Sequence, residues 1–104
     1  MRISTSRNDG EVTVVRVHST RLDAAVADEL RRGLAEALAT EEAHVIDLSD
    51  VTFMDSSGLG ALVGSLKAAK AKDVAISGAQ PAVRTVFRMT RVDRAIRILP
   101  ATVP

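Results

Sequence analysis

Two adjacent serine hydroxyls, Ser56 and Ser57, are the side chains of this sequence best placed for chemistry. They follow a buried-strand pattern and a polar turn within residues 44–55, and an apolar pattern with helical spacing begins directly after them. The first turn of a helix has unpaired backbone N–H groups and carries the positive end of the peptide dipole. A hydroxyl at that point either caps the helix or carries a phosphate that those N–H groups stabilise. The spacing alone favours the cap and leaves the phosphate open.

The residues around the two serines also admit two interpretations each. Gly58 and Gly60 leave the expected first turn bare, so that a large group could approach its backbone. Asp55 could bond its own backbone as a turn residue, or it could orient the Ser56 hydroxyl or bind a cation of a partner. We favour a local structural role for Asp55 that also affects the chemistry at Ser56.

Phe53 and Met54 are large apolar residues in a chain that is only 2% aromatic. One of the two is expected to anchor the loop in the core. The other, if exposed, would form a contact patch beside the serines.

The sequence offers little for catalysis. The only imidazoles, His18 and His44, have no spacing relation to Ser56, and there is no nucleophile elbow. Cysteine is absent and no carboxylate–histidine cluster occurs, so neither a metal nor a cofactor is expected. The glycines at 58 and 60 do not follow directly on a strand, unlike those of a dinucleotide fingerprint. The chain is therefore not expected to be an enzyme.

Length and composition indicate one globular domain over residues 1–104, since 46% of the residues are hydrophobic. Its core is expected to be aliphatic, because only 2% of the residues are aromatic. The 14 basic and 13 acidic residues are spread along the chain, which gives no electrostatic reason to expect nucleic acid as a partner. No apolar run approaches the roughly 20 residues of a membrane span, and the first residues lack a secretory apolar region. A cytoplasmic protein without a membrane partner is expected.

Strand and helix patterns alternate along the chain in the order ββαβαβαβ. The expected strands cover residues 1–6, 12–17, 44–48, 74–77 and 95–99, and the expected helices cover 24–39, 57–72 and a segment starting at Pro81. Asn8-Asp9-Gly10 would turn the first two strands into a hairpin, and Asp23 would cap the first helix. Short links between the later elements predict a mixed, mostly parallel sheet with an antiparallel N-terminal edge.

Residues 47–60, which read Asp-Leu-Ser-Asp-Val-Thr-Phe-Met-Asp-Ser-Ser-Gly-Leu-Gly, resemble the signature of STAS-domain anti-anti-sigma factors (anti-sigma factor antagonists) nearly letter for letter. Arg21-Leu22-Asp23 and residues 92–99 resemble the family more loosely. Many relatives have Gly shortly before the Leu-Asp pair, where this chain has Ser19-Thr20-Arg21. The resemblance implies a single STAS-type domain, and the departure at residues 19–21 bears on the shape of the loop before Asp23 and so on the choice of partner.

The resemblance also implies a phosphorylation switch. Ser56 would be the phosphoacceptor, and an anti-sigma factor that is also a serine kinase would bind the unphosphorylated chain and release its sigma factor. The kinase would then phosphorylate Ser56, and a serine phosphatase would reset it. The residues expected at the partner interface are Asp23, Met54, Asp55, Ser57 and Gly58.

Two alternatives remain beside this interpretation. Asp23 could be a plain helix cap. The whole chain could be a non-switching STAS module in a stress-signalling or membrane-transport assembly. The complete Asp-Ser-Ser-Gly element argues against the second, because a structural module has no need of a hydroxyl at Ser56.

Overall fold

The computed structural model describes residues 1–8, 12–40, 42–69 and 73–100. The strands are β1 (Arg2–Arg7), β2 (Thr13–His18), β3 (Arg21–Leu22), β4 (His44–Asp47), β5 (Phe53–Met54), β6 (Val74–Ser77) and β7 (Arg97–Ile98). The helices are α1 (Ala27–Ala37), α2 (Ser56–Ala68), α3 (Pro81–Met89) and the short 3-10 helix η1 (Val92–Arg94). The expected turn at Asp9-Gly10 lies outside the described residues, as do residues 70–72 at the end of the helix expected over 57–72. No helix within the described ranges combines the length and apolar character needed to cross a membrane.

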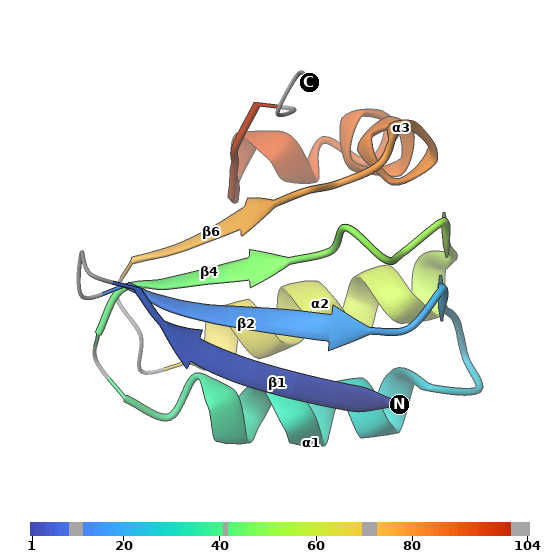
Figure 1. The fold of residues 1–104 in the computed structure, drawn as a ribbon. Helices are drawn as coiled ribbons and strands as arrows, with labels where there is room; N and C mark the ends of the chain where they lie inside the picture. Colours follow the sequence, from blue (N-terminus) through green and yellow to red (C-terminus); the bar gives the residue numbers. More distant parts are fainter. Residues whose placement is uncertain (9–11, 41, 70–72, 101–104) are drawn as a thin grey trace.

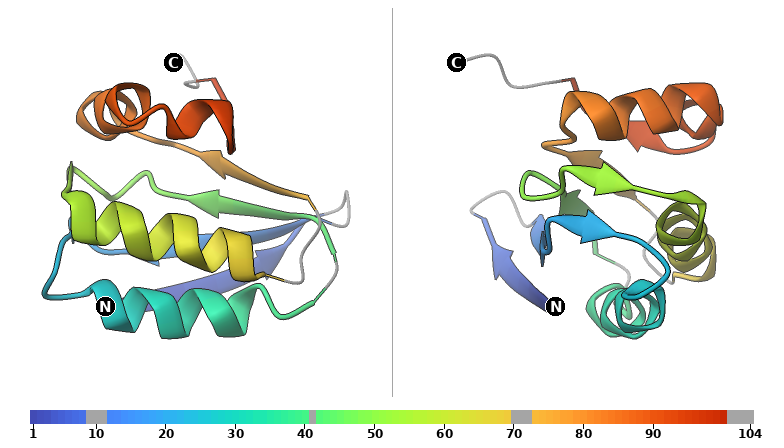
Figure 2. Two further views of the ribbon diagram at one scale, coloured as in Figure 1. Left: turned by 180° about the vertical axis from the view of Figure 1, so that it is seen from behind. Right: turned by 90° about the vertical axis from the view of Figure 1, so that its right-hand side faces the viewer.

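The main sheet has five strands in the order β1-β2-β4-β6-β7 (Figure 1). β1 runs antiparallel to β2, and every other neighbouring pair in this sheet is parallel. α1 and α2 lie side by side over one face of the sheet, and α3 lies toward the β6 and β7 edge (Figure 2). The expected mixed, mostly parallel α/β sheet with an antiparallel N-terminal edge is confirmed.

The core between the sheet and its helices is aliphatic, with one aromatic ring. In β2, Val15 and Val17 are buried while Arg16 between them is exposed, as a strand with one covered face requires. The largest side chain of the core is Phe87 of α3. Other buried core side chains contributed by the helices are Leu30, Leu34, Leu59, Leu62 and Val83.

Two short strands were not predicted. β3 and β5 pair in parallel as a separate two-stranded sheet, with Arg21 opposite Phe53 and Leu22 opposite Met54. Strands of two residues are too short to show an apolar alternation, and β5 falls within the turn expected before Ser56. This small sheet joins the segment before α1 to the segment before α2.

The start of α1 also differs from the expectation. α1 begins at Ala27 rather than at residue 24, and its N-cap is Val26. Asp23 therefore does not cap the helix. Its side chain accepts a hydrogen bond from the Ala25 N–H at 3.1 Å, and its carbonyl accepts one from the Val26 N–H at 3.1 Å. Asp23 closes a turn that precedes α1.

Candidate functional site

Ser56 is the first residue of α2 and is exposed, while Ser57 beside it is half-buried. The N-cap of α2 is Asp55, whose Oδ1 atom accepts a hydrogen bond from the Gly58 N–H at 2.9 Å. The alternative in which Ser56 or Ser57 caps the helix is therefore wrong, and the local structural role favoured for Asp55 is confirmed. Because the carboxylate does the capping, the Ser56 hydroxyl is left for other chemistry.

Replacement of the cap tests this assignment directly. We expect Asp55→Ala to lower the free energy of unfolding by about 1 kcal/mol, the usual effect of losing an N-cap side chain. Ser57→Ala is the matched control, and it should change the free energy of unfolding by less than about 0.5 kcal/mol. Urea denaturation measures both. Equal losses in the two variants would mean that the serine shares the capping.

The segment that leads to Ser56 is fastened to residues 20–22. The Asp55 N–H donates to the Leu22 carbonyl at 3.1 Å, and the Thr52 N–H donates to the Thr20 carbonyl at 2.8 Å. The Thr52 hydroxyl donates to the same Thr20 carbonyl at 3.1 Å. Beneath these bonds the side chains of Leu22 and Met54 are buried in the core. The start of α2 is therefore held in place by backbone hydrogen bonds to residues 20–22 and by buried side chains beneath it.

Met54 is the core anchor of the loop, and Phe53 is its exposed neighbour. Met54 is 5% exposed and Phe53 39%. The expectation that one of the two anchors the loop is confirmed, but the residue expected at the partner interface was Met54. Its buried side chain cannot be a surface contact, and Phe53 is the exposed residue of the pair.

Phe53 forms a small exposed patch with Arg21 and Asp23. The guanidinium carbon of Arg21 lies 4.1 Å from the centroid of the Phe53 ring, and the Arg21 Nε–H donates to the Asp23 carboxylate at 3.2 Å. An exposed cation–π contact contributes about 0.5–1 kcal/mol. Sequence reasoning missed Arg21, because the stack depends on the register of β3 against β5. Asp23, an expected interface residue, joins this patch through its bond with Arg21, two residues earlier in the chain.

The two glycines of the first turns of α2 have different surroundings. Gly58 is buried, and a Cβ atom at this position would collide with the carbonyl oxygen of Leu22. Gly58 thus allows α2 to pack closely on β3 and does not present open backbone to a ligand or partner. Gly60 is exposed, and a Cβ atom there would have no heavy atom within 4 Å. Of the two glycines, only Gly60 leaves open space.

The start of α2 combines the positive end of the helix dipole with the negative charge of the capping Asp55 carboxylate. α2 has no acidic residue in its first turn, and its dipole places positive charge at this end. An anion at such a position is stabilised by about 0.3–1 kcal/mol. Among the described residues, no three histidine, aspartate or glutamate side chains gather as a metal site would require. The site is therefore an exposed hydroxyl at a helix start that a neighbouring carboxylate caps.

Comparison with known proteins assigns a family to this arrangement. A family model described as the STAS domain matches residues 3–103, nearly the whole chain. The match includes the signature block, the small β3–β5 sheet and all helices of the described structure.

Solved structures with similar folds carry related descriptions. An anti-sigma factor antagonist from Mycobacterium paratuberculosis superposes with a TM-score of 0.82 at 29% identity, over 96% of this chain and 86% of that chain. A STAS domain protein from Planctomyces limnophilus, described as an anti-sigma factor antagonist, gives 0.78 at 23% identity over 96% and 90%. The Bacillus cell fate determinant SpoIIAA in its phosphorylated form gives 0.60 at 20% identity over 95% and 92%.

Proposed function

The chain belongs to the STAS domain family, and we propose that it acts as an anti-sigma factor antagonist switched by phosphorylation of Ser56. In this proposal the unphosphorylated chain binds an anti-sigma factor that is also a serine kinase, and the sigma factor is set free. The observation that carries the proposal is the exposed Ser56 hydroxyl at the start of α2. This hydroxyl is not needed as the helix cap, because the Asp55 side chain caps α2. A structural relative at 29% identity is described as an anti-sigma factor antagonist, which supports the same role.

The chain is the substrate of the phosphoryl transfer, and the partner supplies the catalysis. The Ser56 oxygen attacks the γ-phosphorus of ATP held by the kinase, the bond to ADP breaks, and the hydroxyl proton passes to a base of the kinase. The product carries a charge of about −1.5 to −2 at neutral pH. A serine phosphatase restores the hydroxyl.

The contact surface proposed for the kinase surrounds Ser56. It consists of the Arg21, Asp23 and Phe53 patch on one side and of Asp55 and Ser57 at the start of α2. Phe53 and Arg21 supply an aromatic ring and a planar cation, the residue types that dominate interface energetics. Gly58 contributes by allowing α2 to pack closely on β3, and not by touching the kinase.

Mapping of the phosphate tests the proposal. The chain is incubated with ATP and a serine-kinase-type anti-sigma factor of its own organism, and the modified residue is identified by peptide mass spectrometry. We expect one phosphate, on Ser56, that is absent in Ser56→Ala and retained in the matched control Ser57→Ala. Phosphate on Ser57 in the unmodified sequence, or none with any such kinase, would contradict the proposal.

A further inference from the structure

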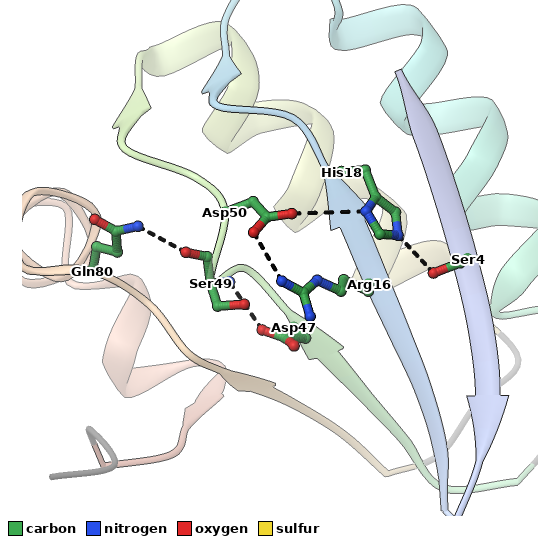
Figure 3. Close-up of polar contacts among 7 residues, drawn as sticks. All are labelled: Ser4, Arg16, His18, Asp47, Ser49, Asp50 and Gln80. Carbon is green, nitrogen blue, oxygen red and sulfur yellow. Dashed lines mark hydrogen bonds and ion pairs between the residues drawn. The ribbon is translucent and has the colours of Figure 1, made fainter. Parts of the chain in front are cut away.

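A second cluster of reactive side chains lies on β1, β2 and the loop after β4 (Figure 3). The Ser4 hydroxyl oxygen lies 2.7 Å from His18 Nε2, within hydrogen-bonding distance. On the other side of the ring, His18 Nδ1 lies 3.7 Å from Asp50 Oδ2. The other carboxylate oxygen, Asp50 Oδ1, accepts a hydrogen bond from Arg16 at 2.9 Å. A serine, an imidazole and a carboxylate thus follow one another in the order of a nucleophile, a base and a group that orients the base.

The strand pairing brings these residues together. Ser4 lies opposite Arg16 in the antiparallel β1–β2 pair, and Arg2 lies opposite His18. Side chains two residues apart share one face of a strand, so Ser4 reaches His18 along the diagonal. His18 has no spacing relation to Ser56, but it has a cross-strand relation to Ser4 that the linear sequence does not display.

The loop that carries Asp50 is itself fixed by neighbouring bonds (Figure 3). The Asp47 carboxylate accepts a hydrogen bond from the Ser49 N–H at 2.9 Å, and the Gln80 side-chain amide donates to the Ser49 carbonyl at 2.7 Å. Asp47 also lies opposite Arg16 in the parallel β2–β4 pair. The residue before Asp50 is therefore fixed by two hydrogen bonds, and the Asp50 carboxylate itself is bonded to Arg16.

The charges around the ring favour one proton arrangement. A neutral imidazole has one N–H donor and one acceptor nitrogen. The negative charge of Asp50 lies 3.7 Å from Nδ1, too far for a hydrogen bond, and it favours a proton on that nitrogen. In that arrangement the Nε2 lone pair faces the Ser4 hydroxyl at 2.7 Å. The hydrogen bond from Arg16 lowers the pKa of the Asp50 carboxyl below its ordinary value, so Asp50 is ionised at neutral pH. The other charged residues on these paired strands are Arg2, opposite His18, Asp47, opposite Arg16, and Arg7, which lies at the far end of β1 opposite Thr13.

We propose that Ser4 is an activated nucleophile and a covalent modification site that accepts acyl groups from activated esters. In this step the Ser4 oxygen forms a bond to the carbonyl carbon, and its proton passes to His18 Nε2. The bond from the carbonyl carbon to the leaving alkoxide or phenoxide breaks, and the leaving group departs with the electron pair. The product is an acyl ester on Ser4. This site is independent of the switch proposed at Ser56.

Acetylation by p-nitrophenyl acetate provides the test, with Ser6 as a control inside the same molecule. Ser6 lies two residues further along β1, opposite Val14 rather than near a histidine, and is more exposed than Ser4. Trypsin cleavage after Arg2 and Arg7 places both serines in one peptide, whose fragment ions separate the two sites. We expect Ser4 to be acetylated at least about tenfold faster than Ser6. This is below the roughly 10²–10⁴-fold effect of a positioned base in an enzyme, because the site is open to water. Exposure alone would make Ser6 the faster site, and that result would overturn the proposal.

His18→Gln removes the base and retains a polar side chain of similar reach. We expect the Ser4 rate to fall to that of Ser6 in this variant, with the Ser6 rate unchanged. A Ser4 rate that is the same in His18→Gln would overturn the proposal. If this variant does not fold, the comparison of Ser4 with Ser6 in the unmodified sequence still decides.

Discussion

Ser56→Asp is expected to weaken binding to the anti-sigma partner by at least about 100-fold, with the stability of the chain nearly unchanged. A charged group buried in an interface without a partner costs several kcal/mol, and each 1.4 kcal/mol changes an affinity tenfold. The chain itself tolerates the charge, because Ser56 is exposed at the positive end of α2. Phosphorylated Ser56, with its larger charge, should have the stronger effect.

Two measurements on each variant separate the interface from the fold. Isothermal titration with the purified kinase-type anti-sigma factor gives the affinity, and urea denaturation gives the free energy of unfolding. Ser56→Ala is the matched control and should bind nearly as well as the unmodified chain. We expect Ser56→Asp to change the free energy of unfolding by less than about 1 kcal/mol. A large stability loss in Ser56→Asp would refute the interface account. Unchanged binding would favour the alternative of a non-switching STAS module.

The sheet and the helices could be predicted from the sequence because their signals are local. Leu30 and Leu34 recur at helical spacing in α1, and the β-branched run of β2 alternates between a covered and an open face. Alternation of strands and helices through short links then determines parallel pairing. The position of Ser56 at a helix start follows from the same patterns.

The features that could not be predicted depend on register between distant segments. The stack of Arg21 on Phe53 and the contact of Ser4 with His18 join residues that come together only through strand pairing. Spacing alone favours a serine as the cap of α2, because Asp and Ser cap helices about equally well. The choice depends on which residue has the extended backbone, and that residue is Asp55.

Gly58→Ala is expected to lower the free energy of unfolding by about 1–3 kcal/mol, the usual cost of overpacking. The added methyl group would collide with the Leu22 carbonyl oxygen and lie 2.9 Å from the Leu22 Cβ atom. That carbonyl cannot easily withdraw, because it accepts the hydrogen bond from the Asp55 N–H. The cost of this collision should therefore exceed the gain of roughly 1 kcal/mol that alanine otherwise brings over glycine in a helix.

Gly60→Ala, two residues further along α2, is the matched control. A methyl group there meets no heavy atom within 4 Å, so we expect it to stabilise the chain by about 0.5–1 kcal/mol. The opposite signs of the two changes, measured by urea denaturation, would confirm that Gly58 sets the distance between α2 and β3. If both variants were more stable than the unmodified chain, α2 and β3 would leave room for a methyl group at position 58.

The same pair of variants connects the packing to the switch. To accommodate an alanine at position 58, the first turn of α2 must move away from β3, and it takes Asp55 and Ser56 with it. We therefore expect the partner kinase to phosphorylate Gly58→Ala more slowly than Gly60→Ala when both are compared well below their unfolding temperatures. Gly58→Ala could be destabilised and still be phosphorylated at the same rate as Gly60→Ala. In that case the kinase would bind the segment around Ser56 in an extended form and would not require the folded start of α2.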